Sequence, residues 1–421
     1  MSVTIPSAEA ATRLLEDSQF REQWDRLFGE CPWASVFQNA DYLGPWYRVY
    51  ADVFEPMLVV SVDASGQLDG LLPLAVEKSG RRLSLAGRPH AEYYAWLSRY
   101  QDRRFIEAAL DSIAPVFPGA ELDFRYLPPG MRLDHWPGGS RWKDRAVIEV
   151  VQRPLIDVRC DPEPIKGAYR TKLNRLNRLG TLEFGQVSQI AEIESDLDAI
   201  VDYCDFRQAA ADRPGPFRSD PRKLPFYRAL FEVPGLLHAT VCRLNGRAIS
   251  AHIGYRDKTE VSLGVLAHSP FFNRHSPGAL HILQLARLLG AQGVDAFDLT
   301  PQGAYKERFA TRHDSVTRLT VHFSTDRLRT ARRQEALLDV GRRGLKVLSI
   351  TPDQARAAAR RARHYARQAW RSGSVAGAAA AFRAFIGRPS PLRVLQHDGS
   401  TFADQPLEHS FSRDSLDHLL A

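Results

Sequence analysis

The segment that follows a short predicted strand near residue 298 carries three side chains that can move protons or stabilise charge. It reads FDLTPQGAYKERF over residues 297–309, so Asp298 ends the strand, and Tyr305 and Lys306 follow a Pro/Gly turn. A carboxylate, a phenol and an amine would meet at one strand end, where α/β proteins commonly bind ligands. The structural alternative is that Tyr305 and Phe309 pack inward while Lys306 is solvated.

A second segment, residues 273–280, has the features of a helix start that could hold an anion. Ser276 suits the N-cap and Pro277 the first helical position, and Gly278 leaves the backbone N–H groups uncovered. The positive end of such a helix favours a pyrophosphate, although an ordinary capped helix explains the same residues. The candidate anion-binding residues, which include two basic ones, are Arg274, His275, Ser276, Pro277, Gly278 and Ala279.

A third segment is a basic helix predicted over residues 165–179 and ended by Gly180. Its charges occur on nearly every face, which favours a solvated helix. A surface that binds a phosphorylated donor or substrate is the functional alternative. The residues concerned are Lys166, Tyr169, Arg170, Lys172, Arg175 and Arg178.

Composition limits the class of protein. The 421 residues are 44% hydrophobic and 25% charged, which excludes a disordered or fibrous chain. No apolar run approaches the roughly 18 residues that span a bilayer, and the first twenty residues are acidic where a signal peptide is basic, so we expect a cytoplasmic protein. The four cysteines lie far apart and form no Cys/His cluster, so we expect buried thiols and no metal.

The positive charge is concentrated near the C-terminus. Residues 326–393 hold sixteen Lys and Arg against four Asp and Glu, whereas the rest of the chain holds 40 basic and 45 acidic residues. The segment is rich in Ala and Arg, and residues 354–371 have the strongest helix pattern. It predicts a basic helical appendage that either docks on the mildly acidic body or binds an anionic membrane surface or RNA through residues 330–393, without binding DNA.

The elements ahead of the appendage are predicted in two passes of mixed strands and helices, which divide the chain into residues 1–151, 152–325 and 326–421. The Asn245-Gly246 pair indicates a tight hairpin in the second pass. The strands predicted in the first pass are 56–62, 68–77, 81–87, 120–127 and 145–151, with a helix over 102–116. The second pass is predicted as helix 165–179, strand 181–187, two helices, three antiparallel strands over 236–267, helix 277–289 and strands 296–299 and 317–323.

These segments, in their order and spacing, resemble the CelD-like branch of the tandem-GNAT, Fem-related acyltransferases over about residues 25–325. The resemblance implies an α/β fold of two tandem GNAT-like domains with mixed, largely antiparallel sheets, the second holding the donor loop, plus the basic helical C-terminal appendage. The segments that carry it are residues 169–180, 225–230, 245–252, 276–278 and 297–309, together with 37–43, 70–74, 85–87 and 92–93.

The resemblance also implies a GNAT-type N-acyltransferase that moves an acyl group from acyl-CoA to an amine of a cell-envelope sugar or small metabolite. Asp298 would act as base or orient the amine, Tyr305 would protonate the leaving thiolate, and Lys306 would bind phosphate or the oxyanion. The enzyme would work in the cytoplasm or peripherally at the inner membrane. The expected substrate-binding residues are Tyr169, Arg170, Arg207, His252 and Gly303.

Two other functions fit the same sequence. One is a Fem-like transferase that takes its acyl group from aminoacyl-tRNA, with the basic appendage holding the RNA backbone. The other is a non-catalytic tandem-GNAT scaffold that docks on an anionic surface. Binding of coenzyme A, tRNA or anionic vesicles distinguishes the three.

Overall fold

The structure, a computed structural model, describes residues 2–100, 102–131, 133, 140–159, 167–210, 214–330 and 332–333. Contacts divide the chain into one compact unit of residues 1–334 and a second of residues 335–421. The second unit, with the helix predicted over 354–371, lies outside the described residues. Among the described helices, none has the length and apolar character needed to cross a membrane.

The first part of the chain forms a five-stranded sheet of order β1-β2-β3-β4, in which β5 also pairs with β3. The predicted three-strand meander is confirmed as β2, β3 and β4. Side chains of Ser7 and Asp17 cap the first two helices. The elements are β1 (Val3–Thr4), α1 (Ala8–Glu16), α2 (Ser18–Glu30), α3 (Ala40–Val49), β2 (Phe54–Val62), β3 (Leu68–Glu77), β4 (Arg82–Leu85), β5 (Leu97–Ser98) and α4 (Arg104–Ile113).

The second part contributes most of an eight-stranded sheet of order β6-β13-β7-β12-β11-β10-β9-β8. The predicted Asn245-Gly246 turn joins β9 and β10, and both of its residues have positive φ. The strands are β6 (Glu121–Phe124), β7 (Ala146–Asp157), β8 (Leu182–Val187), β9 (Leu237–Leu244), β10 (Arg247–Asp257), β11 (Glu260–His268), β12 (Ala296–Asp298) and β13 (Arg312–His322). The helices are α5 (Gly167–Asn177), α6 (Leu197–Ala209), α7 (Lys223–Phe231) and α8 (Pro277–Ala291), with short 3₁₀ turns over Pro270–His275 and Lys306–Arg308.

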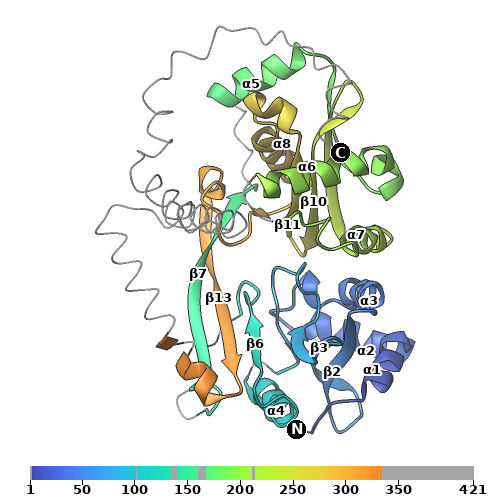
Figure 1. The fold of residues 1–421 in the computed structure, drawn as a ribbon, viewed down its shortest axis with the longest axis vertical. Helices are drawn as coiled ribbons and strands as arrows, with labels where there is room; N and C mark the ends of the chain where they lie inside the picture. Colours follow the sequence, from blue (N-terminus) through green and yellow to red (C-terminus); the bar gives the residue numbers. More distant parts are fainter. Residues whose placement is uncertain are drawn as a thin grey trace, which may run out of the picture. The chain divides into compact units, whose positions relative to one another are not determined.

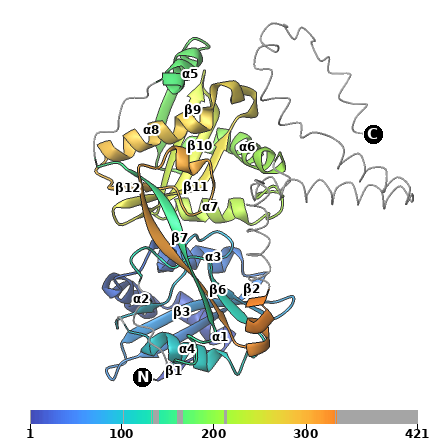
Figure 2. The same cartoon turned by 90° about the vertical axis from the view of Figure 1, so that its left-hand side faces the viewer.

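Two long strands tie the parts together. β7 and β13 pair antiparallel over ten residues, and β6 pairs with the far end of β13 (Figure 1). Figure 2 shows the same two strands running from the region of α8 to the region of α4. The boundary predicted between residues 151 and 152 falls inside β7, and a division into domains at that point stays a prediction.

The chain uses one order of elements twice. In the N-terminal lobe (residues 2–131) an antiparallel meander β2-β3-β4 is followed by α4 and β6, and in the C-terminal lobe (residues 140–323) the meander β9-β10-β11 is followed by α8 and β12. The β11–β12 pairing is parallel, whereas the other strand pairings described are antiparallel. The predicted α/β class with mixed, largely antiparallel sheets is therefore confirmed.

The two lobes share an aromatic core. Phe37 and Tyr42 of the N-terminal lobe pack edge-on against Tyr255 of β10, with ring centroids 5.0 and 5.6 Å apart. Tyr42 also contacts Phe226 of α7 at 5.6 Å. Because such aromatic pairs bury large apolar areas, they fix one lobe against the other at the place where the candidate site lies.

Candidate active site

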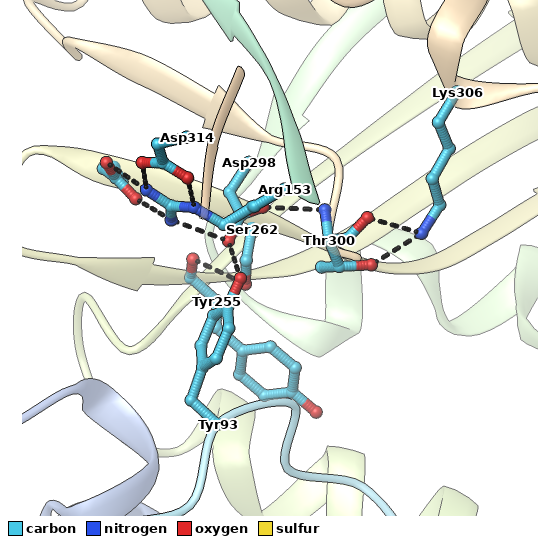
Figure 3. Close-up of polar contacts among 9 residues, drawn as sticks. Tyr93, Arg153, Tyr255, Ser262, Asp298, Thr300, Lys306 and Asp314 are labelled. Atoms are coloured by element: carbon cyan, nitrogen blue, oxygen red, sulfur yellow. Dashed lines mark hydrogen bonds and ion pairs between the residues drawn. The ribbon is translucent and has the colours of Figure 1, made fainter. Parts of the chain in front are cut away.

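Asp298 ends β12 and is held by groups from both lobes. Its carboxylate is 2% exposed and accepts hydrogen bonds from the Tyr93 hydroxyl at 2.5 Å, the Thr300 backbone N–H at 2.7 Å and Arg153 Nη1 at 3.2 Å (Figure 3). Burial and the neighbouring Asp298 raise the pKa of Tyr93 well above its usual value, so Tyr93 stays a donor. This arrangement fixes the carboxylate rather than leaving it free.

Arg153 lies at the centre of a buried ionic cluster. Its guanidinium binds Asp314 through two nitrogens, at 2.7 and 2.6 Å, and binds Glu260 at 2.7 Å besides Asp298. Burial alone would lower the pKa of Arg153, but these carboxylates raise it above its ordinary value. Arg153 was not predicted from the sequence as a site residue. The available signal was a charged residue placed directly before Pro154 and the apolar residues that follow it.

Lys306 is buried rather than solvated. It is 8% exposed, and its Nζ donates to Thr300 Oγ1 at 2.7 Å and to the Thr300 carbonyl at 3.0 Å (Figure 3). Burial lowers its pKa to about 8, partly offset by Glu92 and Asp298. Thr300 has φ +63°, Gln302 has φ +65° and Gly303 has φ +118°, so Lys306 braces a turn of unfavourable backbone conformation. Asp298 and Lys306 thus share Thr300 as a partner.

Tyr305 and Phe309 do not both pack inward. Phe309 is buried and faces the ring of Tyr169 at 6.3 Å, whereas Tyr305 is 40% exposed. Burial raises the pKa of Tyr305, although the nearby Arg207 partly lowers it. Tyr305 therefore keeps its phenolic proton. Gly303 lies against the Lys306 side chain, which a Cβ at this position would meet at 3.3 Å.

A cleft of about 180 Å³ lies in front of this cluster, between the lobes. Glu92 enters it from the N-terminal lobe, and burial raises the pKa of this carboxyl, with Arg125 partly opposing the shift. Arg207 of α6, one of the predicted substrate-binding residues, lines the opposite wall. Neither Asp298 nor Lys306 is among the lining residues. The lining includes Phe37, His90, Glu92, Cys204, Arg207, Lys223 and residues 262–265 of β11.

The cleft lies where two parallel strands separate. β11 pairs with β12 only from Glu260 to Ser262, opposite residues 296–298, and then continues alone on that side to His268. Its other edge stays paired with β10. Among the described residues, the stretch from Leu263 to His268 therefore has no strand paired with this edge, which begins at the cleft.

The start of α8 lies beyond the far end of β11. Ser276 occupies the N-cap position with φ +52°, but its side chain makes no cap; its Oγ accepts a hydrogen bond from Lys172 Nζ of α5 at 2.7 Å. The expected side-chain cap is therefore absent, and Pro277 has no N–H to offer. The N–H groups of Gly278 and Ala279 face the helix end without a described side-chain cap.

Positive charge surrounds this helix start. His275 is buried, accepts a hydrogen bond from Arg274 at 3.0 Å through Nε2, and has no partner for Nδ1 among the described residues. Burial, together with Arg274, Arg175 and Lys172, lowers the pKa of His275. The predicted basic helix, confirmed as α5, thus directs part of its charge toward α8, while Arg170 is exposed and Lys166 lies outside the described residues.

Gly278 permits a close contact with the end of β11. A Cβ at Gly278 would lie 2.6 Å from Cδ2 of His268, so a larger residue at this position would collide with the His268 ring. Burial and then the charge of Arg207 lower the pKa of His268. His268 therefore connects the start of α8 with the wall of the cleft.

His252 is not brought to the cleft. Its ring is fully buried against Phe297 at 5.5 Å and His281 at 6.5 Å. Burial, with His281 adding to it, lowers the pKa of His252 well below its usual value. The expected substrate contact of His252 stays a prediction. Among the described residues no cluster of three or more His, Cys, Asp or Glu side chains could hold a metal ion.

One known protein family matches the part of the chain that contains the elements described above. Residues 166–309, roughly a third of the chain, match a family described as an acetyltransferase (GNAT) domain. The segment contains the free edge of β11, the start of α8 and the turn braced by Lys306. The match, with the repeated order of elements, confirms the fold class of GNAT-like lobes; the CelD-like branch stays a prediction.

Solved structures similar to this chain have low sequence identity and TM-scores below 0.5. The C-terminal domain of a putative lysylphosphatidylglycerol synthetase from Agrobacterium fabrum is 16% identical, with 77% of this chain and 96% of that chain covered and a TM-score of 0.48. FemX is 10% identical over 77% and 96%, with a TM-score of 0.47. A tandem GNAT protein from the clavulanic acid biosynthesis pathway is 11% identical over 77% and 98%, with a TM-score of 0.46. No curated protein matches the chain significantly.

Proposed function

We propose that this protein transfers an acyl group from acyl-coenzyme A to an amine of a cell-envelope sugar or small metabolite, in the cleft between the lobes. One observation carries the proposal: a partly buried carboxylate, Glu92, lines the cleft at the point where β11 leaves β12, and the same strand leads to the cationic start of α8. A thioester at one end and phosphates at the other would suit these two environments.

The donor would lie along the free edge of β11. From Ser262 to His268 the strand extends about 20 Å, at roughly 3.3 Å per residue, which suits an extended amide-bearing arm. Its amide groups would form hydrogen bonds with the unpaired backbone edge, and its pyrophosphate would accept hydrogen bonds from the backbone N–H groups of Gly278 and Ala279. Lys172 and Arg274 would add positive charge, so the residues present fit the donor's anionic end.

The amine acceptor would enter the cleft and attack the thioester carbonyl. The new N–C bond forms as the C–S bond breaks, and the amine proton passes to Glu92, whose raised pKa makes it a better proton acceptor than an ordinary carboxylate. Arg207 would stabilise the oxyanion, and Tyr305 would donate a proton to the thiolate. The proton taken up by Glu92 would then pass through solvent and restore the Tyr305 phenol. Asp298, occupied by three donors, would position Tyr93 and Thr300 rather than act as base.

Thiol release from acetyl-coenzyme A, measured against a panel of amino sugars and small amines, tests this proposal. Glu92→Gln should lower kcat at least about 100-fold, the scale of a general base, while coenzyme A affinity by calorimetry is unchanged. Gln186→Glu, a substitution on exposed β8 outside the cleft, serves as control. If the protein binds tRNA or anionic vesicles but not coenzyme A, the RNA-dependent or the scaffold function is favoured instead.

A further inference from the structure

A second cavity, of about 810 Å³, lies in the N-terminal lobe and takes no part in the proposed reaction. Its walls come from β4 and the turn before it, from the loop over residues 116–120, from β6, and from the helical turn that holds Arg327. Its volume is within the range of roughly 300 to 1,000 Å³ that is typical of small-molecule sites. A cavity of this size can hold a small-molecule ligand.

Two sheet edges border the cavity. β4 is the last strand of the five-stranded sheet and pairs with β3 alone, and β6 is the last strand of the eight-stranded sheet and pairs with β13 alone. No strand lies between β4 and β6 among the described residues. Their outer backbone groups therefore remain available to a molecule in the cavity.

The charged residues of the wall leave a surplus of arginine. Arg82 is paired with Glu77, Arg88 is paired with Asp123 at 2.9 Å, and Glu121 lies 3.2 Å from His322. Within the described ranges, the two remaining arginines of the wall, at positions 81 and 327, form no ion pair. An anion in the cavity would supply the partner that these two guanidinium groups lack.

The same cavity has an apolar side. Val116 is 56% exposed, an unusual state for a large aliphatic side chain, and Phe117 and Leu83 are only partly buried beside it. Phe54 and Ala120 complete this side. An apolar group placed here would remove Val116 from water, which is favourable in proportion to the area covered.

We propose that this cavity binds an amphipathic anion, a molecule that joins a phosphate, sulfonate or carboxylate to an apolar chain. The anionic group pairs with Arg81 and Arg327, and the apolar chain covers Val116 and Phe117. Such a ligand is either dissolved or drawn from a lipid bilayer, and both sources present the same chemistry. The site is separate from the cleft that holds Glu92.

Calorimetry of the full-length protein with decyl phosphate, kept below the concentration at which it forms micelles, tests the site. We expect one molecule to bind, and Arg81→Glu or Val116→Asp to weaken it about tenfold or more, because each variant removes one half of the recognition. Arg247→Glu is a matched control, since Arg247 also follows a Gly-containing hairpin turn and is exposed. Val150→Asp is the second control, because Val150 is 68% exposed on β7 outside the cavity.

Each variant's melting temperature confirms that it is folded, so a loss of binding reports on the cavity. Inorganic phosphate should bind far more weakly than decyl phosphate, and vesicles containing phosphatidic acid show whether the ligand is also taken from a bilayer. No binding of decyl phosphate to the wild type, equal affinity of all four variants, or equal affinity for inorganic phosphate would overturn the proposal.

Discussion

The N-terminal and C-terminal lobes use the same order of strands and helix but build different sites at the equivalent place. In the C-terminal lobe, β11 and β12 are joined by three residue pairs, and the cleft beside them is only about 180 Å³. In the N-terminal lobe, β4 and β6 do not pair, and the space between them is about 810 Å³. The two lobes therefore differ both in the pairing of these strands and in the size of the hollow beside them.

The helices that follow the two meanders differ in charge. Glu107 lies in the first turn of α4, where an acidic side chain complements the positive helix end. The first turn of α8 has no acidic residue, and Lys172, Arg175 and Arg274 surround it instead. The first turn of α4 thus carries an acidic residue of its own, whereas cations surround the start of α8.

Breaking the ionic cluster should show the largest difference between the lobes. Arg153→Met leaves Asp298 buried without its cation and should lower the free energy of unfolding by about 3 to 5 kcal/mol. Arg82→Met, in the N-terminal lobe, removes an exposed ion pair to Glu77 and should lower the free energy of unfolding far less. Urea denaturation measures both, and equal losses would show that the cluster is no more important than a surface pair.

The buried Lys306 should make stability depend on pH. Its pKa is about 8 in the folded protein and near 10.5 when unfolded, so between these values the unfolded chain binds more protons and stability rises with pH. The contribution is at most about 3 kcal/mol and is fully lost below pH 8. Denaturation at pH 7 and pH 10, compared with Lys306→Met, isolates it. A difference between wild type and variant that stays constant with pH would contradict the lowered pKa.

Removing one cation from the start of α8 should have a smaller effect, confined to donor binding. Lys172→Ala should weaken coenzyme A binding about five- to tenfold, because Lys172 both positions Ser276 and adds charge at the helix end. Arg178→Ala, just beyond α5, is the matched control, since Arg178 is exposed and contacts only its own segment in the described structure. If calorimetry finds the same coenzyme A affinity for the two variants, α5 is not part of the donor site.

Local sequence was enough to predict most helices and strands. The run from residue 297 to residue 309 predicted a strand end followed by a turn, but it did not predict that Lys306 braces this turn through Thr300; the expected binding of phosphate or the oxyanion by Lys306 stays a prediction. Glu92 and Arg153 were not selected, because their partners are distant along the chain; Tyr93 meets Asp298 across 205 positions. Such contacts depend on how the lobes pack, and no spacing rule within a segment encodes them.

The predicted N-cap position of Ser276 is confirmed, but its side chain makes no cap. Its residue type and the following proline correctly indicate a helix start, but Lys172, which lies 104 positions earlier, takes its hydroxyl. A left-handed backbone at Ser276 then turns the side chain away from the N–H groups it was expected to cap. Tertiary contacts thus changed the role of a residue whose local position was predicted correctly.

A crystal structure of the acetyl-coenzyme A complex tests the central claim most directly. We predict density for the pyrophosphate at the N–H groups of Gly278 and Ala279, and for the thioester beside residues 262–265 within reach of Glu92. Density for the donor only in the cavity between β4 and β6, or a thioester outside the cleft, would contradict the assignment of catalysis to the cleft between the lobes.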